Sequence, residues 1–140
     1  MKLALFDFDG TITKKDTLIG FIIHANGFAK YIGGMLLLAP MLIAYKLKIL
    51  PNYRAKQIML SYFFKGWDEQ YFKRLAYEYS RQEIDKITRK DAMEQIAWHQ
   101  KQGHEVVVVS ASAECWVKGW CDMHGVKLIA TKLKMDKGKY

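Results

Sequence analysis

Cysteine, acidic residues and long apolar runs are all scarce in this chain of 140 residues. Its two cysteines, Cys115 and Cys121, are six positions apart on a predicted helix and do not face each other. This spacing argues against a disulfide framework or a cysteine-based metal site. Two aspartates within the first nine residues argue against a secretory signal. We therefore expect a cytoplasmic protein in a reducing compartment.

The shortage of acids leaves a net charge of +8, because 22 Lys and Arg residues outnumber 14 Asp and Glu residues. The basic residues are scattered, and no nucleic-acid-reading motif accompanies them. We therefore expect no nucleic-acid partner. The basic residues are interpreted as solvated faces, or as partners of a negatively charged substrate or surface.

Residues 31–45 form an uncharged, mostly apolar stretch between Lys30 and Lys46. As one helix, these fifteen residues would extend roughly 22 Å, which is short of the roughly 30 Å hydrocarbon core of a bilayer. We expect a buried helix. The alternative is a peripheral segment that contacts a membrane between its basic flanks.

The start of the chain carries the clearest chemical signal. An apolar strand is predicted over residues 3–8. Asp7 lies near its end, Asp9 follows it directly, and Gly10 and Thr11 come next. Side chains alternate along a strand, so both carboxylates should point to one side, and the glycine allows a sharp turn. Two neighbouring carboxylates repel each other unless a divalent cation, a cationic group or a shared proton relieves them. This pattern predicts metal and phosphate chemistry.

A second polar site follows the next predicted strand. Residues 105–110 read as a buried parallel strand that ends at Ser110. Ser112 is expected to cap the following helix, which Gly125 closes before a third strand over residues 126–130. Because ligands bind at the carboxyl ends of parallel strands, Ser110 and the two aspartates should share one crevice.

The segments Asp7-Phe8-Asp9-Gly10-Thr11 and Ser110-Ala111-Ser112 resemble the first two motifs of the haloacid dehalogenase superfamily, in its phosphoserine-phosphatase-like branch, subfamily IB. The resemblance implies an α/β fold with a Rossmann-like parallel sheet. This core would comprise residues 1–15 and 89–140, and an all-helical cap would be inserted at residues 16–88. Within the cap, the sequence predicts helices after Pro51 and after Asp68.

The resemblance also implies Mg²⁺-dependent hydrolysis of a small phosphorylated substrate. Asp7 would be the nucleophile and form an aspartyl phosphate, while Asp9 would act as general acid and then as general base. The Asp7 side chain and the Asp9 carbonyl would bind the Mg²⁺. Thr11, Ser110 and the N–H of Ala111 would bind or position the phosphate.

Two further residues are candidates for substrate selectivity. Asp16 lies where phosphoserine phosphatases tend to carry a glutamate that senses the substrate amine, and the shorter acid weakens the case for phosphoserine. Arg54 is a candidate contact for an anionic substrate group, with a simple solvated position as its alternative.

Two later motifs of the family, a phosphate-binding lysine and an acidic pair that completes the Mg²⁺ site, are not visible. Residues 132–140 read as the start of a β-hairpin, whose lysines and Asp136 come too early to replace them. Losing one preorganised donor typically costs on the order of 10²–10³ in rate. We therefore expect a truncated form of a longer hydrolase that is a poor catalyst by itself.

Two alternatives remain open. One is a non-catalytic homologue that binds phosphate, metal or a partner through its open sheet edge. The other is a membrane-surface lipid-phosphate phosphatase, because some relatives in this subfamily dephosphorylate lipid phosphates. The sequence makes no prediction of the oligomeric state.

Overall fold

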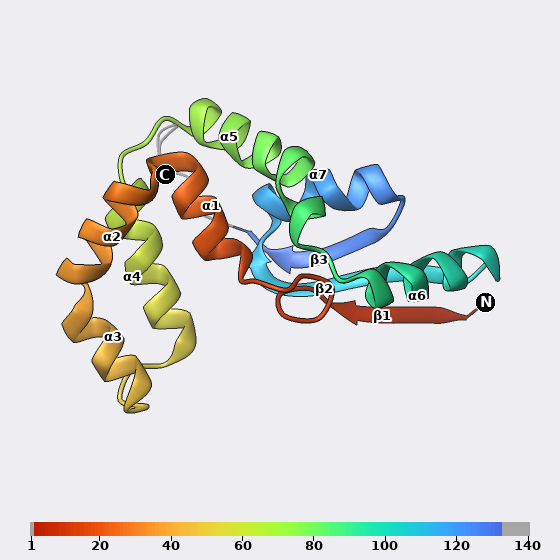
Figure 1. Cartoon of the computed structure of the whole chain (residues 1–140), viewed down its shortest axis with the longest axis horizontal. Coiled ribbons are helices and arrows are strands. Elements are labelled where there is room, and N and C mark those ends of the chain that lie inside the picture. The colour runs from red at the N-terminus through yellow and green to blue at the C-terminus, as the bar shows by residue number, and fades with distance from the viewer. Residues whose placement is uncertain (1, 133–140) are drawn as a thin grey trace.

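The computed structural model of the chain describes residues 2–132. A parallel three-stranded sheet forms its core (Figure 1), with the strands in the order β1 (Leu3–Asp7), β2 (Glu105–Ala113) and β3 (Lys127–Thr131). This arrangement confirms the predicted α/β fold. The hairpin predicted for residues 132–140, with Asp136, lies almost entirely outside the described residues.

The three predicted strands are all present, but the bounds of all three differ from the prediction, and those of β3 are shifted by one residue. β1 stops at Asp7 because the Phe8 carbonyl accepts the N–H groups of the next turn, in which Gly10 has φ +79°. β2 continues past Ser110 to Ala113, with a shift in its register against β3. The prediction that Ser112 caps the next helix is wrong, since Ser112 belongs to the strand and its hydroxyl is used elsewhere.

Two helices cover one face of the sheet. The ring of Phe6 in β1 packs against His99 of α6 (Lys90–Lys101), and the ring of Phe8 packs against Trp120 of α7 (Glu114–His124). Alternate residues of a strand point to opposite faces. On the other face, within the described part of the chain, the side chains of Leu3, Leu5 and Ile129 are exposed.

Five α-helices and a short 3-10 helix separate β1 from α6 in the sequence. These are α1 (Thr17–Asn26), α2 (Phe28–Leu37), α3 (Ala39–Lys46), α4 (Asn52–Phe64), α5 (Glu69–Gln82) and η1 (Ile84–Ile87). In Figure 1, α1 to α4 form a lobe beyond the arrowheads of the strands, and α5 lies over α7. The helices predicted after Pro51 and Asp68 are confirmed as α4 and α5, and the Asp68 carboxylate caps α5 by accepting the Tyr71 N–H at 3.1 Å.

An aromatic cluster joins this lobe to the sheet-covering helices. The ring of Phe21 in α1 stacks on Phe64 of α4 and on Trp116 of α7, with centroid distances of 5.2 and 5.0 Å. Phe72 of α5 meets Phe21 edge-on. All four rings are buried, so the inserted helices and the α/β core share one hydrophobic interior. The division into a cap at residues 16–88 and a core stays a prediction.

The helix predicted over residues 31–45 is wrong in two respects. The segment forms two helices, α2 and α3, bent by 67° with respect to each other, and Pro40 lies in the first turn of α3. Proline lacks the N–H that a continuous helix would need. The segment is also only partly buried: Gly34 is the buried residue of α2, and none of the residues of α3, all of them described, is buried.

Among residues 2–132, no single helix is both long and apolar enough to cross a membrane. The bent pair α2 and α3 meets the requirements of length and composition only when its two helices are taken together.

Two adjacent glycines of α2 should respond oppositely to alanine. A Cβ on Gly34 would come within 2.5 Å of the Phe63 ring and 2.7 Å of the Tyr62 ring, whereas a Cβ on Gly33 meets nothing within 4 Å. We expect Gly34→Ala to lower the free energy of unfolding by roughly 1–3 kcal/mol through overpacking. Gly33→Ala should raise it by up to about 1 kcal/mol through helix propensity. Urea unfolding measures both changes, and equal midpoints would contradict the packing of α2 on α4.

Candidate active site

Asp7 lies at the carboxyl end of β1, next to Val109 of β2 in the sheet register. Its side chain is exposed, and the Thr11 hydroxyl donates to its Oδ2 at 3.5 Å. Among the described residues this is the one hydrogen bond to the Asp7 carboxylate, and it is long. The carboxylate is therefore open to a ligand.

The turn after β1 brings Thr11 back toward Asp7. The Phe8 carbonyl accepts the N–H groups of Thr11, Ile12 and Thr13 at 2.9 to 3.1 Å. Gly10 adopts the left-handed backbone that favours glycine, and its N–H donates to the Thr13 hydroxyl at 3.3 Å. The DxDGT segment thus forms a closed loop at the end of the strand.

The Asp9 carboxylate connects three segments of the chain. Its Oδ1 accepts both the backbone N–H and the hydroxyl of Thr17, at 2.7 and 2.6 Å, at the start of α1. Its Oδ2 accepts the hydroxyl of Ser112 and, at 3.5 Å, the hydroxyl of Ser110, both in β2. Four donors therefore surround this carboxylate, and hydrogen bonds to a charged acceptor are stronger than neutral ones.

A second set of contacts orients these donors. The indole Nε1 of Trp116 donates to the Thr17 hydroxyl at 3.1 Å, which leaves that hydroxyl its own proton to donate to Asp9. The Ser112 N–H donates to the Ser110 hydroxyl at 3.0 Å. Thr17, Ser112 and Trp116 are all buried, so little water competes for these bonds.

Thr17, Ser112 and Trp116 were not among the residues predicted for the site. The spacing of Ser110 and Ser112 was a usable signal, because residues two apart in a strand share one face. Thr17 and Trp116 carry no comparable signal, since only the packing of α1 against α7 brings them together.

A cleft of about 700 Å³ separates the end of β2 from α4. The residues that line it are Leu18, Asn52, Tyr53, Lys56, Gln57, Leu60, Ser61, Lys65, Ala111, Ser112, Ala113, Trp116, Thr131 and Lys132. Three of them are lysines and none is acidic, so the cleft favours anions. Asp7 and Asp9 do not line it; Ser112 lines it and also donates to Asp9.

The two residues predicted for substrate selectivity lie away from this cleft. Asp16 caps α1 by accepting the Leu18 N–H at 2.8 Å, and it lines a separate hollow with His24 and Tyr79. Arg54 is exposed on α4 and is not among the residues that line the cleft. Lys56, two positions along the same helix, lines the cleft instead.

The donors around Asp7 suit Mg²⁺, but they are few. Within residues 2–132, no three His, Cys, Asp or Glu side chains come together in a way that could hold a metal ion. Mg²⁺ often binds through one or two carboxylates and keeps several waters. The Asp7 carboxylate is open, as such a site requires, and the Mg²⁺ site with the Asp9 carbonyl as a second ligand stays a prediction.

Two thiols and one phenol among the described residues are kept in their neutral forms. Burial raises the pKa of the Cys115 and Cys121 thiols to about 12, so neither is a reactive thiolate near neutral pH. Burial, helped by the charges of Asp9 and Asp16, raises the pKa of the Tyr79 hydroxyl above its usual range. These three groups therefore act as packing residues.

Comparison with protein families identifies one match, the haloacid dehalogenase-like hydrolases, over residues 4–140. None of the curated proteins compared with the chain matches it.

Several solved structures share the fold. A protein of unknown function from Bordetella pertussis Tohama I has a TM-score of 0.80 at 21% identity, covering 99% of this chain and 64% of its own. A phosphoserine phosphohydrolase-like protein from Francisella tularensis subsp. tularensis SCHU S4 has a TM-score of 0.69 at 15% identity, covering 100% and 63%.

A phosphoserine phosphatase, solved as a phospho-aspartyl intermediate analogue, has a TM-score of 0.59 at 21% identity, covering 99% of this chain and 59% of its own. The chain thus spans about three fifths of the length of these three proteins. At these identities the likeness establishes the fold.

Replacing Thr17 by valine should destabilise the site while keeping the shape of the side chain. The change removes one donor to Asp9 and leaves the buried Trp116 N–H without its acceptor. We expect the free energy of unfolding to fall by roughly 1–3 kcal/mol, measured by urea unfolding. Thr88→Val is the matched control, because the Thr88 hydroxyl donates to the Asp85 carbonyl at an exposed position. An equal loss in both variants would contradict the role given to Thr17.

Proposed function

The chain belongs to the haloacid dehalogenase-like hydrolases. From this premise we propose that its function is that of a Mg²⁺-dependent phosphatase, which hydrolyses small phosphate monoesters with Asp7 as the nucleophile. The observation that carries the proposal is the open Asp7 carboxylate at the carboxyl end of β1, two positions before the hydrogen-bonded Asp9. Ligands of open parallel sheets bind at this edge.

In the proposed first step, an oxygen of the Asp7 carboxylate attacks phosphorus and the ester P–O bond breaks. The leaving oxygen takes a proton from Asp9, and an aspartyl phosphate forms on Asp7. The solved phosphoserine phosphatase named above, described as a phospho-aspartyl intermediate analogue, supports this route by analogy.

In the second step, water attacks the phosphorus of the aspartyl phosphate and gives its proton to Asp9, which releases phosphate and restores Asp7. Four hydrogen-bond donors hold Asp9 in the described arrangement. Asp9 would enter the first step carrying a proton, lose it to the leaving oxygen and regain it from the water in the second step. To carry this proton, Asp9 must give up one of the four donors, such as the distant Ser110 hydroxyl, so that its protonated oxygen faces the substrate oxygen or the water.

The phosphate itself would be held by the end of β2. We assign the Ser110 hydroxyl and the Ala111 N–H to its oxygens, with Thr11 positioning the loop that carries Asp7. Mg²⁺ bound by Asp7 and the Asp9 carbonyl would neutralise charge on the phosphate, so that an anionic nucleophile can approach it.

The cleft beside Ala111 indicates the kind of substrate. Lys56 of α4, Lys65 directly after α4, and Lys132 line it, and no acid among the described lining residues could pair with a substrate ammonium group. We therefore infer a small phosphorylated substrate whose remaining groups are neutral or anionic.

Two protonated free thiols suit a reducing compartment, and we propose a cytoplasmic location on that ground.

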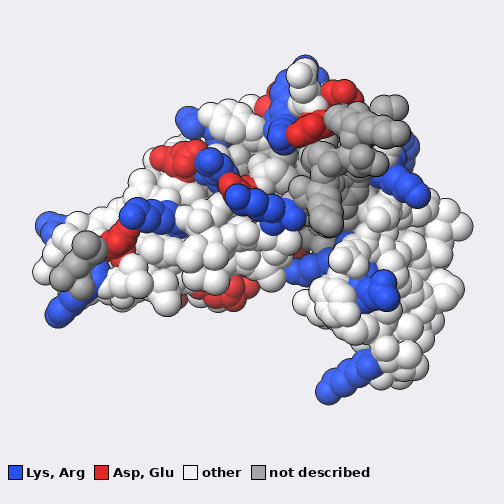
Figure 2. Space-filling view, turned by 180° about the vertical axis from the view of Figure 1, so that it is seen from behind, with Lys and Arg blue, Asp and Glu red and all other residues white. Residues whose placement is uncertain are grey.

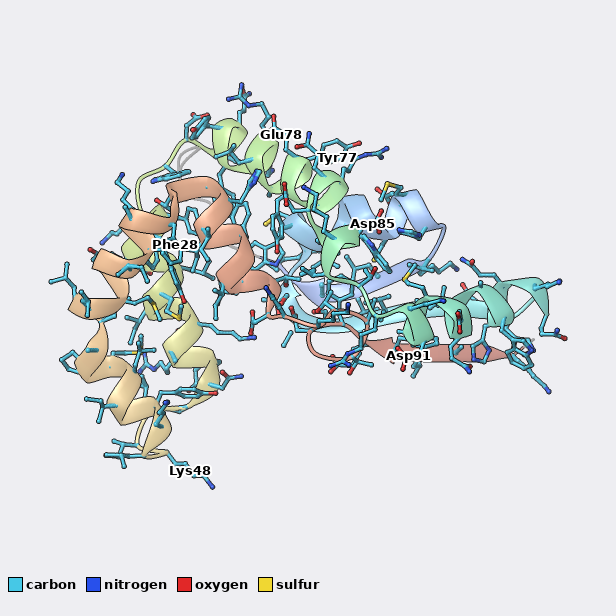
Figure 3. The ribbon with its side chains drawn as sticks, in the orientation of Figure 1. Phe28, Lys48, Tyr77, Glu78, Asp85 and Asp91 are labelled. Carbon is cyan, nitrogen blue, oxygen red and sulfur yellow. The ribbon has the colours of Figure 1, made fainter. Side chains whose placement is uncertain are left out.

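Beryllofluoride, a mimic of the phosphoryl group on a carboxylate, tests the role of Asp7 without requiring turnover. We expect it to raise the melting temperature of the chain in the presence of Mg²⁺, and Asp7→Asn to abolish this shift because the amide cannot form the adduct. Asp91→Asn is the matched control, since Asp91 is an exposed acid on α6 (Figure 3). A shift that survives Asp7→Asn would refute the assignment.

Turnover of an aryl phosphate separates the remaining alternatives. Hydrolysis that needs Mg²⁺ and disappears in Asp7→Asn supports the phosphatase. Binding of Mg²⁺ and beryllofluoride without hydrolysis favours the non-catalytic homologue.

Two residues of α4 should differ in their effect on anion binding. Lys56 lines the cleft and Arg54 does not. We expect Lys56→Gln to raise the dissociation constant of inorganic phosphate about fivefold, equivalent to about 1 kcal/mol for one nearby charge. Arg54→Gln should leave it unchanged. Calorimetric titration measures both, and a larger effect at Arg54 would restore that residue as the substrate contact.

A further inference from the structure

Acidic residues are confined to one part of the molecule. All 14 Asp and Glu residues lie outside residues 17–67, a segment that spans α1 to α4. Its charged residues are Lys30, Lys46, Lys48, Arg54, Lys56 and Lys65, which contribute +6 of the net charge of +8. Figure 2 shows the consequence: the lobe on the right carries white and blue surface, and the red surface lies over the rest of the molecule.

Within this lobe, α2 is apolar on two adjacent faces, and Lys30 is its one charged residue. Tyr31, Gly34 and Met35 face the molecule, where Gly34 lies against the rings of α4. Phe28, Ile32 and Leu36 follow a spacing of four residues, so they share the outer face. Their side chains are exposed, Phe28 by 64% and Leu36 by 72%. A helix that is apolar all round is normally buried in protein or lipid.

The exposed apolar surface continues through α3 and the loop after it. Ile43 in α3 and Leu47 and Ile49 in the loop are exposed, Ile49 by 74%. Lys48 lies between the last two and projects from the tip of the lobe, away from the sheet (Figure 3). Apolar side chains thus alternate with lysines along this outer edge, and contiguous apolar surface of this kind marks an interaction site.

We propose that α2, α3 and the loop to Ile49, together the docking edge, bind the surface of an anionic membrane. Phe28, Ile32, Leu36 and the apolar loop residues would enter the boundary between headgroups and acyl chains, and the lysines would contact anionic headgroups. The segment lies in the plane of the interface, because α2 and α3 are bent by 67° and neither is long enough to span.

Two features favour a membrane over a protein as the occupant. Protein interfaces are enriched in Arg and depleted in Lys, whereas the charged residues of the docking edge are all lysines, Lys30, Lys46 and Lys48. Basic residues interspersed with large exposed aliphatic side chains are typical of segments that lie on anionic lipid. The docking edge also leaves the cleft free, because none of residues 28–49 lines it.

Co-sedimentation of the chain with phosphatidylcholine vesicles, with and without phosphatidylglycerol, tests the proposal. We expect binding to the vesicles that contain phosphatidylglycerol and a large decrease at high salt. Leu36→Glu should weaken binding at least about tenfold, because it places an acid in the exposed apolar row. The double variant Lys46→Gln/Lys48→Gln should also weaken it at least about tenfold, as expected for two lysines near an anionic surface.

Matched controls lie on the opposite end of the molecule. Trp98→Glu, on α6, also exchanges an exposed apolar side chain for an acid. Lys101→Gln/Lys118→Gln also removes two exposed lysines. Both controls should bind like the unchanged chain. If Leu36→Glu fails to fold by circular dichroism, Ile49→Glu in the exposed loop provides the same test.

Three results would overturn the proposal. The first is no binding to vesicles that contain phosphatidylglycerol. The second is an equal loss in the docking-edge variants and their controls. The third is that the chain does not bind vesicles but forms a dimer in solution, and that Leu36→Glu dissociates this dimer. This result would assign the docking edge to a second copy of the chain. The proposal does not depend on catalysis, so loss of phosphatase activity in Asp7→Asn leaves it unaffected.

Discussion

The carboxylate of Asp9 fixes the relative positions of the turn after β1, the start of α1 and the end of β2. Its partners Thr17 and Ser112 are buried, and their hydroxyl oxygens lie 3.2 Å apart. If Asp9 were absent, one hydroxyl could donate to the other, and the second would lose its acceptor. An unsatisfied buried polar group costs about 1–3 kcal/mol, which is a sizeable part of the stability of a typical domain. The same bonds fix the position of Asp9, which follows the open Asp7 by two positions in the sequence. One side chain therefore serves both the fold and the proposed chemistry.

The inserted helices attach to the α/β core in two different ways. α5 packs closely on α7, because a Cβ on Gly119 would come within 2.1 Å of the Ser80 hydroxyl oxygen. α1 and α4 attach through the rings around Phe21. By contrast, α2 packs against α1, α3 and α4, α3 packs against α2 and α4, and both keep an exposed apolar outer face. The lobe thus presents a polar, basic wall to the cleft on one side and an apolar edge on the other.

Local patterns in the sequence predicted the parallel strands, α4, α5 and the carboxylate loop, because short-range periodicity and turn residues decide these features. They did not predict the contacts that depend on long-range packing. Serine is a residue type that commonly caps helices, yet the Ser112 hydroxyl donates to the Asp9 carboxylate and Ser112 stays in the strand. Arg54 and Lys56 look equivalent in sequence, and only the orientation of α4 separates them. Apolar composition predicted burial of residues 31–45, but composition alone cannot show whether neighbouring protein is available to cover them.

The pairing of β1 with β2 has a consequence for biosynthesis. Leu3 pairs with Glu105, so the first strand has its sheet partner about a hundred residues later. At roughly 5–20 residues per second, a ribosome needs about 5–20 s to supply that partner. During this interval the helices α1 to α4, with their exposed leucines and isoleucines, emerge before the sheet can form. The aspartate loop is therefore among the first parts of the chain to be made and among the last to be assembled.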